Sequence, residues 1–306
     1  MSHPLPNRGP SNAKVITFIV ILSFICALIL STLASALAKP KEIAQEIDRS
    51  KQMMIAAKIL SHEGYFLIQD KDGKYGPAKV ENGKLVPGNV NDIPSNEQVL
   101  EIYKKRLKAF LVDDKGKIFS FKEAGINEEE YVAQNKKNGY YKLPYRLLYE
   151  ILPNETDEKN AKPIGYVIPV NGYGLWDAIY GYIAIEPNTN TVIGISWYDQ
   201  KETPGLGANI AEASWQNLFP GKHIFQASPN GKTDFKTSGL GILVVKGKVS
   251  EVLGDIPKAK SAVDGMAGAT LTGNGVTDAY REVLSAYRPF FISLNAENKS
   301  DNQKES

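Results

Sequence analysis

The sequence contains few of the residues that build metal sites or disulfide frameworks. Its 306 residues include one cysteine, Cys26, and three histidines, which are scattered at His3, His62 and His223. These counts exclude a disulfide scaffold, a CxxC redox motif and a zinc ligand set of the usual spacing. We therefore expect no metal site in the chain.

The chain also lacks an excess of charge of one sign. Its 36 lysines and arginines against 34 aspartates and glutamates give a formal net charge of +2. Such a balance produces no strong positive electrostatic potential that would attract nucleic acid, and no nucleic-acid partner is expected. No GxGxxG opens a βαβ unit, and no Walker lysine is present. Carboxylates are plentiful, but no spacing singles out an acid–base pair, so no catalytic residue is assigned.

One long segment contains no charged residue, and it runs from Val15 to Ala38. As a helix it would span roughly 36 Å, enough to cross a hydrocarbon core of about 30 Å. The pattern predicts a polar tail over 1–13, a transmembrane helix over 14–38 in contact with lipid, and a helical connector over 39–62.

A cleaved signal peptide is the alternative interpretation of the same segment. Arg8 and Lys14 precede it, and Ala36-Leu37-Ala38 imitates a cleavage site. Lysines and arginines flank the segment on both sides. Counted alone, they would keep the large domain in the cytoplasm, although long domains can be translocated regardless of such counts. Charge therefore leaves the orientation open.

The remaining pattern predicts one domain over 63–295 and a polar, disordered tail over 296–306. Runs rich in β-branched and aromatic residues predict strands at 147–151, 163–170, 178–185, 192–198 and 242–245. Apolar residues at helical spacing predict helices at 96–110, 211–218 and 275–287. The expected fold class is α+β, with a twisted, mostly antiparallel sheet flanked by helices.

A run of small residues surrounds one hydroxyl, Thr270, in the segment 264–275. Gly268 and Ala269 leave room for a phosphate and a bulky ring to approach the backbone. The helix expected to begin near Gly275 would direct its free N–H groups and its positive dipole end toward this loop. We expect Asn274 or Thr272 to cap that helix. A Gly-rich turn without any ligand remains the alternative interpretation.

Two other Gly-containing loops adjoin predicted strands. Residues 201–207 follow one strand, and residues 171–176 precede another. Each alone is an ordinary turn, but three such loops separated by strands can converge at one edge of a sheet. Trp176 would then either contact a ligand in the site or pack in the core; the sequence leaves both open.

These motifs together resemble a known family. In order, they are Gly-Leu-Trp at 174–176, Glu-Thr-Pro-Gly-Leu-Gly at 202–207, Trp-x-x-x-Phe-Pro-Gly-Lys at 215–222 and Gly-Ala-Thr-Leu-Thr at 268–272. The order is similar to that of the FMN-binding domains of redox-driven ion pumps, and especially of the C subunits of sodium-translocating NADH:quinone oxidoreductases. The likeness is strong over residues 140–290 and weak over 63–135.

The resemblance implies that Thr270 carries FMN through a phosphoester and that the chain passes electrons toward quinone beside other subunits. It also implies a flavin transferase that works outside the cytoplasmic membrane, which places the domain on the outer, periplasmic side of the inner membrane. The family usually has Ser or Thr where this chain has Ala267. Besides Thr270, the residues expected around the cofactor are Asp264, Gly268, Ala269, Leu271, Thr272, Trp176, Glu202, Thr203, Leu206 and Gly207.

Two other functions remain open. One is the related G-type subunit of an ion-pumping ferredoxin:NAD oxidoreductase, which has the same flavin chemistry with a different electron donor. The other is a membrane-anchored structural or binding module that has lost the flavin, with Ala267 as the sign of that loss.

Overall fold

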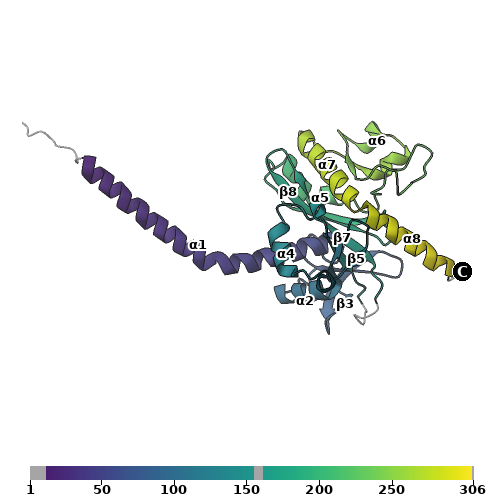
Figure 1. Cartoon of the computed structure of the whole chain (residues 1–306), viewed down its shortest axis with the longest axis horizontal. Coiled ribbons are helices and arrows are strands. Elements are labelled where there is room, and N and C mark those ends of the chain that lie inside the picture. The colour runs from purple at the N-terminus through teal and green to yellow at the C-terminus, as the bar shows by residue number, and fades with distance from the viewer. Residues whose placement is uncertain (1–11, 155–160, 305–306) are drawn as a thin grey trace, which may run out of the picture. The chain divides into compact units, whose positions relative to one another are not determined.

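A computed structural model describes residues 12–154 and 161–304 of the chain (Figure 1). The chain forms two units, residues 1–48 and residues 49–306. Helix α1, Asn12–Ala56, occupies the described part of the first unit and continues into the second. It passes through Pro40 without a break, so the expected transmembrane helix and residues 39–56 of the expected connector form one helix, which ends before residue 62. By length and composition α1 can span a membrane.

The second unit is built on a six-stranded, fully antiparallel sheet in the order β5-β4-β6-β7-β8-β9. The mixed fold predicted from the sequence is confirmed. The strands are β4 (Leu107–Val112), β5 (Ile118–Phe119), β6 (Arg146–Ile151), β7 (Gly165–Tyr173), β8 (Ala178–Ile185) and β9 (Val192–Asp199).

Both faces of the central strands are buried, which explains why they are apolar almost throughout. In β8, Ile183 belongs to one hydrophobic core, whereas its neighbours Tyr182 and Ala184 belong to the other. The alternation follows from the two-residue repeat of a strand. The sheet is thus the middle layer between two sets of helices and loops.

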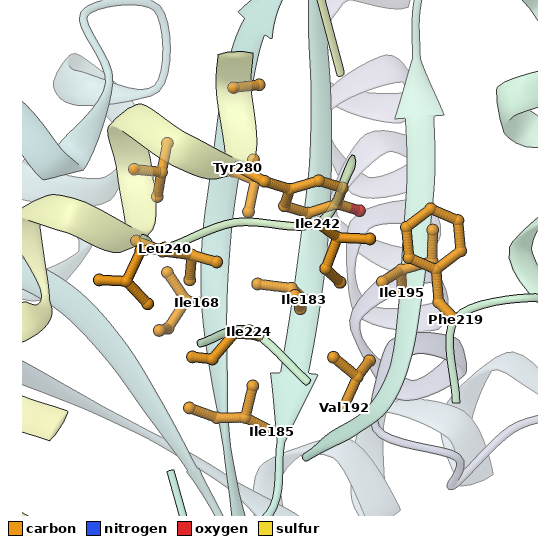
Figure 2. Packing of buried hydrophobic residues seen from close by; sticks show 14 of the residues in the cluster. Ile168, Ile183, Ile185, Val192, Ile195, Phe219, Ile224, Leu240, Ile242 and Tyr280 are labelled. Atoms are coloured by element: carbon orange, nitrogen blue, oxygen red, sulfur yellow. The ribbon is translucent and has the colours of Figure 1, made fainter. Parts of the chain in front are cut away.

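Helices α7 (Thr270–Ala286) and α8 (Arg288–Lys304) pack in the first core. A Cβ on Gly172 of β7 would lie 2.5 Å from the Cβ of Ala279, so the glycine lets α7 approach the sheet closely. Figure 2 shows side chains from the strands, from α7 and from the segment 217–242 meeting in this core, among them Ile168, Ile183, Ile195, Phe219 and Tyr280.

The second core covers the opposite face of the sheet. It contains the end of α1, with Met53 and Met54 fully buried, and the apolar side of helix α2, Asn96–Arg106. A capping box between Ser95 and Gln98 begins α2. The other elements on this side are β1 (Phe66–Gln69), β2 (Tyr75–Glu81), β3 (Lys84–Pro87), α3 (Phe121–Ala124) and α4 (Glu128–Asn135).

Several boundaries differ from those predicted. The helix expected over 96–110 ends at Arg106, because residues 107–112 pair with β6 as a strand. The helix expected over 211–218 is divided into η2 (Gly207–Ala211) and α5 (Ala213–Gln216). Residues 296–304 continue α8 in place of the expected disordered tail. Residues 1–11 of the expected N-terminal tail lie outside the described residues. The remaining short elements are η1 (Tyr140–Lys142), β10 (Leu243–Val244), α6 (Val249–Val252), η3 (Pro257–Ser261) and β11 (Ala262–Val263).

Two buried tyrosines near the C-terminal half of α7 give a matched test of this packing. The hydroxyl of Tyr287 donates to the carbonyl of Leu147 at 2.6 Å, whereas the buried hydroxyl of Tyr280 lies near the indole N–H of Trp197 but makes no hydrogen bond of ordinary geometry within the described ranges. We expect Tyr287→Phe to lower the free energy of unfolding by about 1–2 kcal/mol, and Tyr280→Phe to leave it unchanged or raise it by about 1 kcal/mol. Urea unfolding of the detergent-solubilised chain measures both, and equal losses would contradict the assignment.

Candidate functional site

Thr270 is the first residue of α7 and its side chain is exposed. The expectation that the helix begins near Gly275 is therefore wrong, and neither Asn274 nor Thr272 caps it. The N-cap position is Ala269, and no described side chain caps the helix there. The free N–H groups of the first turn and the positive end of the helix dipole consequently lie at Thr270 itself.

The loop before Thr270, residues 264–269, is the acceptor loop, and its turn depends on one glycine. Gly268 has φ +73°, a left-handed conformation that side chains rarely adopt. A Cβ at this position would also lie 2.9 Å from Cδ2 of Leu206. Gly268 therefore allows the turn and lets Leu206 lie against the acceptor loop.

The buried carboxylate of Glu202 joins the three Gly-containing loops. Glu202 is only 5% exposed. Oε1 accepts from the backbone N–H of Trp176 at 3.0 Å, and Oε2 accepts from that of Leu175 at 3.1 Å and from the hydroxyl of Thr272. The predicted convergence of the loops at the sheet edge thus occurs at a single side chain.

The charge of Glu202 is stabilised by these donors alone. Burial on its own would raise the pKa of this carboxyl, but the hydrogen bonds from Thr272, Trp176 and Leu175 outweigh burial, so its pKa lies below the ordinary value. Within the described segments no lysine or arginine forms an ion pair with Glu202. The carboxylate therefore stays ionised through fixed dipoles rather than through a cation.

Two glycines make room for this carboxylate. A Cβ on Gly174 would lie 2.4 Å from Oε1 of Glu202. A Cβ on Gly207 would lie 2.7 Å from Oε2 and 2.4 Å from the hydroxyl oxygen of Thr272. Cβ atoms do not come this close to other atoms, so a side chain at either position would displace the carboxylate of Glu202 from its donors.

Three apolar side chains that the sequence analysis expects near Thr270 are exposed. Trp176 is 68% exposed, and its indole N–H donates to the hydroxyl of Thr203 at 3.1 Å. Leu206 and Leu271 are also exposed. Trp176 is therefore not a core residue, and its contact with a ligand stays a prediction.

A cavity of about 420 Å³ lies beside Thr270. Its volume is in the range of small-molecule sites. Part of its lining comes from β10 and the loop that follows, a segment that the sequence analysis did not assign to the site. The residues that line it are Val244–Lys248, Asp264–Thr270, Gly273 and Asn274.

Asp264 lines this cavity and also organises it. Its Oδ1 accepts from the backbone N–H of Val249 at 2.8 Å, and its carbonyl accepts from the indole N–H of Trp215 at 3.1 Å. The structure thus gives Asp264 a positioning contact that the motif alone does not reveal. An exposed hydroxyl, an uncapped helix start and a cavity of this size fit a flavin nucleotide, whereas Trp176, Leu206 and Leu271 are not among the residues that line the cavity.

Comparisons with known proteins agree with this geometry. The sequence profile of the FMN-binding domain family matches residues 174–285. The C subunit of the Na(+)-translocating NADH-quinone reductase of Chlamydia muridarum is 38% identical, over 94% of this chain and 96% of that relative. The chain belongs to this family of C subunits. The corresponding protein of Chlamydia caviae is 40% identical over 94% of each chain.

Proteins of this family are components of an oxidoreductase complex, as the names of its members state. The crystal structure of the family member from Parabacteroides distasonis shares the fold, with a TM-score of 0.51 and 23% identity over 83% of this chain and 96% of that one. The predicted family and fold are confirmed. The G-type alternative is set aside, because the relatives at 38–40% identity are C subunits.

The Glu202 contacts predict a pH-dependent stability. Trp176 donates to one oxygen of Glu202, and Leu175 and Thr272 donate to the other. Because the amide nitrogen of Gln cannot accept a hydrogen bond, Glu202→Gln loses the donors of one of these oxygens and should lower the free energy of unfolding at pH 7 by about 1–3 kcal/mol. The folded pKa of Glu202 is lowered, so its contribution is present above the ordinary pKa of 4.5 and is lost as the pH falls through the lower folded value.

Urea unfolding between pH 7 and about pH 3 measures this difference, which should shrink toward acid pH. The matched control is Glu129→Gln, which removes an exposed carboxylate of α4. A Glu202→Gln deficit that stays constant with pH would contradict the role given to the ionised carboxylate.

Proposed function

We propose that the Oγ1 atom of Thr270 carries FMN through a phosphoester and that the chain passes electrons within the membrane reductase toward quinone. Bound FMN supplies the redox chemistry, and the protein supplies position and electrostatics. The observation that carries the proposal is the place of Thr270, exposed, beside the cavity and at the uncapped start of α7. A phosphodiester there would keep one negative charge, which a helix N-terminus favours.

Each part of the site has a defined role in this proposal. Thr270 holds the ester, while Gly268 and Ala269 leave the space beside it. Trp176, Leu206 and Leu271 cover the ring system with exposed apolar surface, and Thr203 orients the indole of Trp176. Glu202, Thr272 and Gly207 fix the three loops relative to one another, and Asp264 fixes the cavity wall.

Attachment requires a second protein, a flavin transferase. Oγ1 of Thr270 would form a bond to the flavin-side phosphorus of FAD, the pyrophosphate bond to AMP would break, and the hydroxyl proton would leave. The exposure of Thr270 supports this step, because an external enzyme can reach it. Ala267 is exposed in the same loop, and its lack of a hydroxyl leaves the acceptor atom unchanged.

The placement of the chain completes the proposal. Helix α1 would anchor it in the lipid of the bacterial cytoplasmic membrane, with the FMN-binding domain on the outer side, where the transferase works. The relatives are named as subunits of a sodium-translocating NADH-quinone reductase, which supports the other subunits of such a complex as partners. A membrane-anchored module without flavin is the remaining alternative.

Substitution of the acceptor separates these two functions. When the chain is co-expressed with its transferase, we expect an added mass of FMN minus water and flavin fluorescence that survives SDS. Thr270→Val should abolish both because it removes the attacking oxygen, whereas Thr270→Ser should retain them. Thr237→Val, at an exposed threonine outside the site, is the control. Recovery of an unmodified Thr270 peptide from fully active complex would refute the proposal.

A further inference from the structure

The cavity beside Thr270 is also lined by two lysines that no motif identified. Lys246 and Lys248 are exposed and line the cavity. They lie in the loop after β10, residues 245–248, which we name the lysine loop. Strand β10 pairs in parallel with β11. Because parallel strands end on the same side, the lysine loop and the acceptor loop leave the strand pair together.

Two hydrogen bonds join the lysine loop to the acceptor loop and to the strand before it, and a third is donated by the residue that follows the lysine loop. The N–H of Val245 donates to the carbonyl oxygen of Val263 at 3.1 Å, and the N–H of Gly265 donates to the carbonyl oxygen of Gly247 at 2.8 Å. The third bond is the one from Val249 to Asp264. A Cβ on Gly265 would lie 2.0 Å from the carbonyl oxygen of Val245, so glycine is required for this approach. The lysines are therefore held at the cavity rather than on a free loop.

The charges around the cavity favour an anion. Among the described residues, the charged ones that line it are Lys246, Lys248 and Asp264, and the carboxylate of Asp264 already accepts a backbone N–H. Over the residues that the structure describes, neither lysine forms an ion pair. The start of α7 adds a positive partial charge on the acceptor side. Anionic groups in the cavity would thus meet positive charge from the two lysines and from the start of α7.

We infer that Lys246 and Lys248 form the cationic wall of the flavin site. They hold the anionic flavin nucleotide at Thr270 while the ester forms, and they raise the redox potential of the flavin afterwards. Reduction adds negative charge to the flavin, and nearby cations favour the form that carries more of it. The inference rests on the proposed function, since it assumes that FMN is attached at Thr270.

The first measurement is the initial rate of flavin attachment to the detergent-solubilised full chain, with purified transferase and FAD. The double variant Lys246→Gln/Lys248→Gln should be slower by about tenfold at low salt, as expected for the loss of charge-assisted contacts. The deficit should shrink as NaCl approaches about 1 M, where the Debye length is about 3 Å. The double arginine variant should keep the wild-type rate, and so should Lys232→Gln, the control at an exposed lysine outside the cavity.

The second measurement separates the cavity from docking of the transferase. After prolonged loading, the midpoint potential of the attached flavin should be lower in the double glutamine variant than in wild type, and unchanged in the arginine and Lys232 variants. An unchanged potential would overturn the inference, even with a slower rate, because the lysines would then serve only the transferase. Failure of the wild-type chain to gain any flavin would instead refute the proposed function, and the inference with it.

Discussion

The site depends on one buried carboxylate that has no cationic partner among the described residues. Glu202 stays ionised because two backbone N–H groups and the hydroxyl of Thr272 donate to it. A buried charge is costly unless every such donor is in place. The donors belong to the loop that carries Trp176 and to the first turn of α7, so the charge is stabilised only when both have their native positions relative to the loop of Glu202. The same interaction that stabilises Glu202 therefore aligns Trp176, Leu206 and the first turn of α7.

The sheet makes this alignment possible by fixing the ends of the loops. Its central strands are buried on both faces, and α7 approaches β7 closely where Gly172 faces Ala279. A further close contact occurs at Gly275, where a Cβ would lie 2.0 Å from the carbonyl oxygen of Tyr173. The start of α7 is thus held against the end of β7, next to the loop that carries Trp176. Rigid packing positions the acceptor, and the exposed loops provide the surface around it.

The sequence predicted the parts of this arrangement that local patterns encode. Strand runs such as 178–185 and the order of the Gly-containing motifs identified the sheet and the three loops. The sequence pattern predicts that α7 starts near Gly275, because Asn274 and Thr272 are polar residues of the kind that cap helices. The helix starts earlier, at Thr270, because the apolar residue Ala269 occupies the N-cap position. The strand 107–112 was included in a helix, since its apolar residues continue the preceding helical spacing and only pairing with β6 decides otherwise. Lys246 and Lys248 were missed because β10 and β11 are two residues long, and their parallel pairing is a long-range contact without a local signal.

The opposite charges of the site act on different parts of it. A carboxylate near an anion site would by itself weaken anion binding through Coulomb repulsion. The carboxylate of Glu202 accepts hydrogen bonds from three donors. The carboxylate of Asp264 accepts one from the backbone N–H of Val249, which follows the lysine loop. Both carboxylates therefore serve the loops, while Lys246 and Lys248 border the cavity. The chain has almost no net charge, yet it offers a positive cavity because each negative group at the site is already engaged by its own donors.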